Sequence, residues 1–71
     1  DDEIAVIETR LDVARALASL SPRQRAAVVL TELLEFSSEE AGRMLAIAPG
    51  TVRMHASRGR AALADILGSA R

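Results

Sequence analysis

The chain has 71 residues, a formal net charge of -1, and apolar residues that are almost all aliphatic, with Phe36 as its one aromatic side chain. A chain this short buries only about 60% of the surface that its unfolded form exposes, so it has room for one small domain. It has no cysteine and one histidine, which excludes disulfides, thiolate chemistry and a zinc site built from cysteine and histidine.

Two amphipathic helices are predicted in the first half of the chain. Apolar residues recur at intervals of three and four, the spacing of one helix face, which predicts a helix over residues 4–20. The residues of this stripe, expected to be buried, are Ile4, Ile7, Leu11, Ala14, Leu17 and Leu20. Ser21 and Pro22 offer a capping hydroxyl followed by a proline at the first helical position, which predicts a second helix over residues 22–35. Its buried residues are expected to be Ala26, Val29, Leu30, Leu33 and Leu34.

Two further helices joined by a tight turn are predicted in the second half. Ser37 and Glu40 have the spacing of a capping box, which predicts a short helix over residues 38–45. Residues 46–48 form the turn, and Pro49 begins a helix over residues 49–67 that Gly68 is expected to end. The inner side of this last helix is expected to carry Val52, Ala56, Leu63 and Ile66. The sequence thus predicts one all-α domain of four helices.

Residues 41–53 have the pattern of a helix-turn-helix. This unit needs a small residue where its helices cross, a tight turn, and an apolar residue that anchors the second helix so that its other face enters the major groove. Gly42, Ala46 and Val52 fit these three roles. The apolar contacts between them are expected from Ala41, Leu45 and Ile47. A plain helical bundle has the same periodicity and remains an alternative on this pattern alone.

Charge is distributed unevenly along the chain. Residues 1–40 hold nine acidic residues against four arginines, whereas residues 41–71 hold five arginines against Asp65 alone. A local concentration of positive charge is what attraction to phosphate groups requires. We therefore interpret the second half of the chain as the candidate nucleic-acid contact, in spite of the negative net charge.

Four segments of the sequence resemble region 4 of extracytoplasmic-function (ECF) sigma factors. They are LSPRQRAAVVL at residues 20–30, FSSEEAGRML at 36–45, PGTVR at 49–53 and SRGRAAL at 57–63, in the order and at the spacing of that family. The resemblance implies a four-helix domain of the winged-helix-like superfamily, without a wing, that contacts the -35 promoter element. In such factors a separate region 2 opens the -10 element. Region 2 is absent here, and the chain begins at Asp1 rather than Met, so we expect a fragment of a longer sigma factor.

Five positions depart from the usual pattern of the family. Ala46 replaces the turn glycine, and Ala48 replaces a serine that caps the recognition helix. Ala56 stands where a larger aliphatic residue is common, and Gly59 is expected to weaken the recognition helix. His55 stands where a basic residue is frequent.

The resemblance assigns two kinds of DNA contact. Base reading falls to residues that share one exposed face of the last helix, and an arginine there can hold the O6 and N7 atoms of guanine in two hydrogen bonds. These candidates are Arg53, Met54, Ser57 and Arg58. Phosphate contacts fall to backbone N–H groups at the start of that helix, to an arginine near the start of the second helix, and to one further arginine. These candidates are Gly50, Thr51, Arg25 and Arg60.

Two other functions remain open at this stage. Thr51 to His55 also match the segment of a LuxR-type response regulator, whose DNA-binding domain uses its last helix for dimerisation. A protein-interaction module that binds an anti-sigma factor is the second alternative. An enzyme is not expected, because no nucleophile has a base beside it and the adjacent Glu39 and Glu40 point apart on a helix.

The expected partners follow from the resemblance. They are double-stranded promoter DNA, the β flap of the RNA polymerase core and an anti-sigma factor, with the isolated domain a monomer. We expect no metal, no cofactor and no membrane contact, since no stretch approaches the roughly 18 apolar residues of a membrane span. The acidic start of the chain is the opposite of a signal peptide, so a cytoplasmic location is expected.

Overall fold

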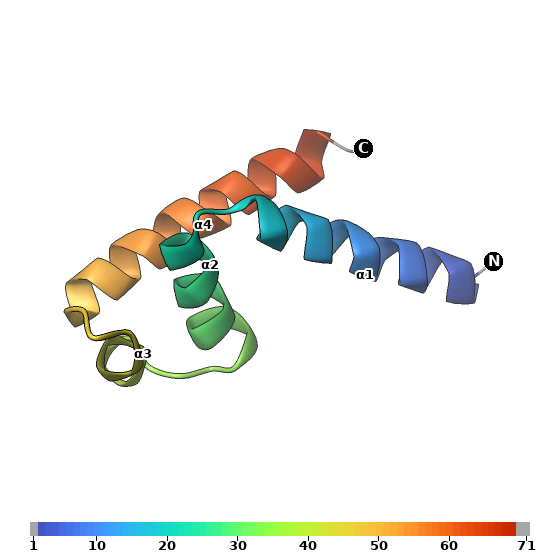
Figure 1. Cartoon of the computed structure of the whole chain (residues 1–71). Helices are drawn as coiled ribbons and strands as arrows, with labels where there is room; N and C mark the ends of the chain where they lie inside the picture. Colours follow the sequence, from blue (N-terminus) through green and yellow to red (C-terminus); the bar gives the residue numbers. More distant parts are fainter. Residues whose placement is uncertain (1, 70–71) are drawn as a thin grey trace.

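The computed structural model describes residues 2–69, and this part of the chain is helical without any strand. Its elements are α1 (Asp2–Ser19), α2 (Pro22–Val28), the π-helix η1 (Val29–Leu33), α3 (Ser38–Leu45) and α4 (Pro49–Ser69). Figure 1 labels the four α-helices. The predicted all-α class and the helix-turn-helix, formed by α3 and α4, are both confirmed. None of these helices combines the length and the apolar character needed to cross a membrane.

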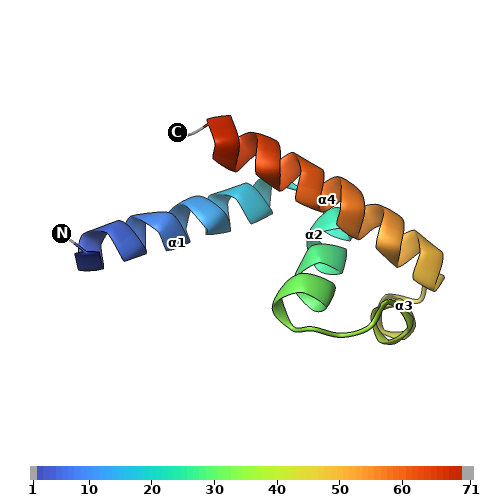
Figure 2. The ribbon, with the colours of Figure 1, turned by 180° about the vertical axis from the view of Figure 1, so that it is seen from behind.

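The longest helix, α4, organises the domain. It packs against α2 along its middle and against α3 at its N-terminal end, while η1 also contacts α3. Seen from the front and from behind, α1 runs away from this body, and its N-terminal half diverges from the C-terminal half of α4 (Figures 1 and 2). The packed body therefore consists of α2, η1, α3 and most of α4.

Small side chains build the core. Ala27, Ala41, Val52 and Ala56 form one buried cluster, with Leu30 and Ile47 packed against it. Gly59 continues this small face of α4, because a Cβ atom there would lie 2.6 Å from Val28 Cγ2 and 3.3 Å from the Gln24 carbonyl oxygen. Ala56 and Gly59 thus let α2 and α4 approach closely.

Only the C-terminal end of α1 is packed, so the prediction of a buried stripe along the whole helix was wrong. Ala16 and Leu20 are buried, but Ile4, Ile7 and Leu11 are exposed. The reason is tertiary: α1 extends beyond the body, where none of the described elements covers its first turns (Figure 2).

The second predicted helix changes type at Val29, which was not expected. Beyond this point the Leu34 N–H donates to the Val29 carbonyl five residues earlier, at 3.0 Å, and the backbone becomes a π-helix. A π-turn changes the direction in which later side chains point, so Leu33 and Leu34 are 59% and 57% exposed instead of buried. The segment then ends on Glu35, whose φ of 60° is left-handed.

Two expectations for the last helix were also wrong. Ile66 is 40% exposed, in an open hollow between the C-terminal part of α4 and α1. Gly68 does not end the helix, which continues to Ser69. A glycine that ends a helix commonly does so in a left-handed conformation, and Gly68 has no positive φ.

Local capping signals fix the helix-turn-helix. The Ser37 hydroxyl accepts from the Glu40 N–H, and the Glu40 carboxylate accepts from the Ser37 N–H, both at 3.0 Å, which confirms the predicted capping box. These hydrogen bonds with Ser37 hold the pKa of the Glu40 carboxyl below its ordinary value. The Ser21 hydroxyl likewise accepts from the Gln24 N–H at the start of α2.

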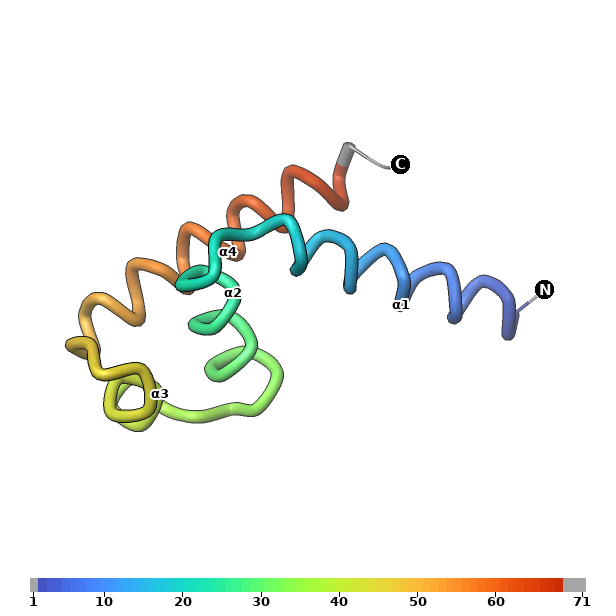
Figure 3. The backbone as a smooth tube through the Cα atoms, viewed as in Figure 1, coloured from blue at the N-terminus to red at the C-terminus, as the bar shows by residue number. Residues whose placement is uncertain are grey.

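A short turn, traced in Figure 3, joins α3 to α4 and passes through a left-handed residue. Ala46 has φ 57° and ψ 43°, and the Ile47 N–H donates to the Gly42 carbonyl oxygen at 3.0 Å. At Gly42 a Cβ atom would lie 2.7 Å from the Ile47 carbonyl oxygen, which makes it the small residue of the crossing. The predicted roles of both residues are confirmed.

Ala46→Gly is expected to stabilise the domain by about 0.5–1 kcal/mol, because glycine adopts a positive φ without the Cβ clash that alanine has. For a domain of this size the melting temperature should rise by roughly 2–8 °C, measured by circular dichroism. The matched control is Ala61→Gly, an exposed position inside α4, where glycine should destabilise by about 1 kcal/mol. A lower melting temperature for Ala46→Gly would contradict the left-handed turn.

Candidate nucleic-acid interface

One side of α4 is buried and the opposite side is exposed over its first three turns. Val52, Ala56 and Gly59 are buried in the packed body. The base-reading candidates all lie on the exposed side, and they are Arg53, Met54, Ser57 and Arg58. The packed body thus contacts one side of α4, and the opposite side exposes two arginines, a serine and a methionine. A helix that enters a major groove needs this arrangement.

The arginines of this helix differ in their partners. Arg53 Nη1 lies 3.6 Å from Glu39 Oε1 of α3, and both side chains are largely exposed. Arg60 Nη1 donates to Glu32 Oε1 of η1 at 2.5 Å. Arg58 is exposed and has no ion pair or hydrogen bond with any other described side chain. Arg58 can therefore approach a ligand without leaving a protein partner.

The N-terminus of α4 offers fewer free backbone donors than the sequence indicated. The Ala48 carbonyl oxygen accepts from the Thr51 N–H at 3.0 Å and from the Val52 N–H at 3.1 Å. Pro49 has no N–H. An anion at this helix end would therefore bind mainly to the Gly50 N–H, and Thr51 would have to share its donor.

Arg25 has a structural role that the sequence did not reveal. Its Nε donates to the Leu17 carbonyl at 3.0 Å, and its Nη2 donates to the Leu20 and Ala18 carbonyls at 3.0 and 3.2 Å. The guanidinium thereby caps the last turn of α1 and fastens it to α2. A phosphate would have to compete with these carbonyl oxygens for Arg25.

His55 belongs to the packed side of α4 more than to its exposed side. It is half-buried, and its Nδ1 atom is buried without a hydrogen-bond partner among the described residues. It lies one residue from the exposed Met54 but points to another face of the helix, since adjacent residues of a helix diverge.

Two grooves flank α4 and share one boundary. A polar groove is lined by Thr31, Glu32, Ser38, Arg53, Ala56, Ser57 and Arg60. An apolar groove between α1, η1 and α4 is lined by Val13, Leu17, Val28, Glu32, Leu33, Arg60 and Leu63. The ion pair of Glu32 and Arg60 lines both grooves and separates them.

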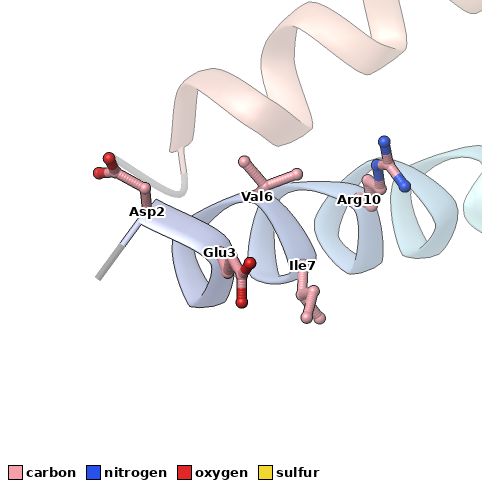
Figure 4. A pocket seen from close by; sticks show the side chains of 5 residues that line it. All are labelled: Asp2, Glu3, Val6, Ile7 and Arg10. Carbon is pink, nitrogen blue, oxygen red and sulfur yellow. The ribbon is translucent and has the colours of Figure 1, made fainter.

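The N-terminal half of α1 carries a further surface hollow. It is lined by residues of this helix alone, and Figure 4 shows them: Asp2, Glu3, Val6, Ile7 and Arg10. Val6 and Ile7 both line the hollow, although they project in different directions in Figure 4. This hollow lies apart from the exposed face of α4 and contributes nothing to it.

Comparison with known proteins supports the resemblance to sigma factors that the sequence indicated. Residues 10–63 match the family described as Sigma-70, region 4. The ECF RNA polymerase sigma factor SigM of Mycobacterium tuberculosis is 45% identical over 67 residues, which cover 94% of this chain and 34% of that protein. No solved structure matches the chain.

Two other relatives have similar identity over a shorter stretch. The ECF RNA polymerase sigma factor SigE of Mycolicibacterium smegmatis is 48% identical over 56 residues, covering 79% of this chain and 22% of that protein. The RNA polymerase sigma factor CarQ of Myxococcus xanthus is 43% identical over 53 residues, covering 75% of this chain and 30% of that protein. The chain spans about a third or less of the length of these relatives. With a family match that covers the helix-turn-helix and relatives that are ECF sigma factors, the chain belongs to the sigma-70 region 4 family.

Proposed function

We propose that this domain binds the -35 element of promoter DNA as the C-terminal part of an ECF sigma factor, and so directs RNA polymerase to initiate transcription. The observation that carries the proposal is the presentation of α4, which is buried along Val52, Ala56 and Gly59 and exposed along Arg53, Met54 and Arg58. A helix fixed on one side and open on the other can lie in a major groove without rearrangement of the fold.

Within this function, the exposed face of α4 reads bases and its flanks hold the backbone. Arg53, Met54, Ser57 and Arg58 are the base-reading residues. Met54 is offset by two from the buried Val52 and faces away from the core. Phosphates are held by Gly50, Thr51 and Arg60, and by Arg25 where a phosphate displaces its carbonyl partners.

Binding to DNA is expected to be modest and steeply dependent on salt. Only a few arginines face the duplex, the acidic first half of the chain opposes its approach, and each arginine that neutralises a phosphate releases counterions. Fluorescence anisotropy with a duplex selected from a random pool by the purified domain measures this affinity from low to physiological salt. Binding that stays constant across this range, or the absence of any selected sequence, would contradict the proposed function.

Protein partners form a second part of the proposal. The exposed Leu33 and Leu34 and the apolar groove beside α4 give an apolar surface away from the base-reading face, suited to the β flap of RNA polymerase or to an anti-sigma factor. The isolated domain is proposed to be a monomer in the cytoplasm. Sedimentation of the purified domain tests this state, and a dimer would favour the LuxR-type alternative.

A further inference from the structure

The polar groove on one flank of α4 combines groups that bind anions. Its volume is about 400 Å³, and it lies where the start of α3 and the end of η1 meet α4. Arg53 and Arg60 contribute guanidinium groups to its lining, and Ser38 and Ser57 contribute hydroxyls. The Thr31 hydroxyl is already engaged, since it donates to the Ala27 carbonyl at 2.7 Å. Because Arg53 and Ser57 are proposed above to read bases, the Arg60 guanidinium and the Ser38 hydroxyl are the donors of this groove that remain for an anion with several oxygen atoms.

Carboxylates now neutralise both arginines of the groove. Glu32 accepts a hydrogen bond from Arg60, and Glu39 lies 3.6 Å from Arg53. Glu32 and Arg60 are 28 residues apart in sequence and are brought together by the packing of η1 near α4. Both are about half exposed, at 46% and 50%, so water screens their attraction. Such a pair holds the guanidinium in place but is weak enough to exchange its anion.

We propose that this groove seats one phosphate of the DNA backbone, and that Arg60 exchanges the Glu32 carboxylate for that phosphate when DNA binds. The proposal rests on the DNA binding proposed above. Arg60 already lines the groove, so the exchange needs a side-chain movement and no change of the fold. Arginine can hold a phosphate through two parallel hydrogen bonds, whereas Arg60 makes one hydrogen bond with the Glu32 carboxylate. Glu32 is then an internal competitor that lowers the affinity for every DNA sequence alike.

A double-mutant cycle of Glu32→Gln and Arg60→Gln tests the exchange. Arg60→Gln should weaken binding to selected and random DNA by the same factor and reduce the slope of log affinity against log salt by about 1. Glu32→Gln should raise affinity by up to about five-fold, the upper end of the range measured for exposed ion pairs. In the Arg60→Gln background the same change should raise affinity clearly less, because no guanidinium remains to be released.

The matched control is Asp12→Asn. It removes one negative charge from an exposed ion pair, that of Asp12 with Arg15 on α1, which lies away from the groove. Asp12→Asn should raise the affinity clearly less than Glu32→Gln does, because Asp12 contributes only to the general negative charge of the first half of the chain. Melting curves of all variants verify that they fold, as expected for half-exposed side chains.

Three outcomes would overturn the proposal, and they are distinguishable. An equal gain from Glu32→Gln in both backgrounds would mean that Glu32 acts only through its charge, without exchange at Arg60. An unchanged affinity and salt slope for Arg60→Gln, in a wild type that does bind DNA, would remove the phosphate seat and leave the proposed function intact. A wild-type domain that binds no DNA would remove both.

Discussion

Gly42→Ala is expected to destabilise the domain by about 1–3 kcal/mol, the range for an added methyl group that a packed site cannot accommodate. The added Cβ would lie 2.7 Å from the Ile47 carbonyl oxygen and 3.5 Å from the Pro49 nitrogen. Both atoms belong to the backbone of the turn, so no side-chain rotation relieves the clash, and α3 must move from α4. A loss of 1 kcal/mol lowers the melting temperature of so small a domain by roughly 4–8 °C.

Gly68→Ala provides the control, because Gly68 lies in α4 with no atom within 4 Å of its added Cβ. There, alanine should stabilise the helix by up to about 1 kcal/mol. DNA affinity gives a second measurement: displacement of α3 alters the turn that sets the start of α4, so Gly42→Ala should also weaken binding at temperatures where it is folded. An unchanged melting temperature for Gly42→Ala would mean that the helices cross at a greater distance.

The helix-turn-helix could be predicted from the sequence because its signals are local. The Ser37 and Glu40 capping box, the left-handed turn at Ala46 and the close crossing at Gly42 each depend on residues that are neighbours in the chain. Their hydrogen bonds span three to five residues. A periodicity or capping pattern can therefore predict them without knowledge of the fold.

The burial of a residue could not be predicted from the sequence where it depends on packing between distant segments. The stripe at Ile4, Ile7 and Leu11 has helical spacing, yet none of the described elements covers it. The π-helix in residues 29–33 interrupts the 3.6-residue period, so Leu33, which the period places in the core, is exposed. From the sequence, Gly59 is expected only to lower the stability of the recognition helix. In the structure it leaves the space that α2 needs to pack closely against α4.

The candidate site shows the same division. The exposure of Arg53, Met54, Ser57 and Arg58 follows from the anchor at Val52 and the helical period, and could be predicted. The hydrogen-bond and ion-pair partners of the arginines could not be predicted from the sequence. Arg60 meets Glu32 across 28 residues, and Arg25 meets carbonyls of α1 that no sequence pattern singles out. Which arginines are already engaged before DNA binds is thus a tertiary property.

Because Arg58 has no partner among the described residues, its removal is expected to have the largest effect on the recognition of DNA bases. Arg58 lies on the exposed side of α4, four residues from Met54 and so on the same helical face. It has no ion pair or hydrogen bond with another described residue, so all the donors of its guanidinium are available to the proposed DNA ligand. Arginine that contacts the O6 and N7 atoms of guanine contributes discrimination against the other bases, which a phosphate contact does not.

Arg58→Ala is therefore expected to weaken binding to the selected duplex by about 1–3 kcal/mol and to relax base preference at one or two positions. This corresponds to a roughly 5- to 150-fold loss of affinity, measured by anisotropy, with the preference measured by repeating the selection with the variant. Arg10→Ala, which removes the same charge from the exposed surface of α1, is the control and should change neither. If Arg58→Ala instead lowered affinity for selected and random DNA by the same factor, the side chain would hold phosphate, and base reading would rest on Arg53.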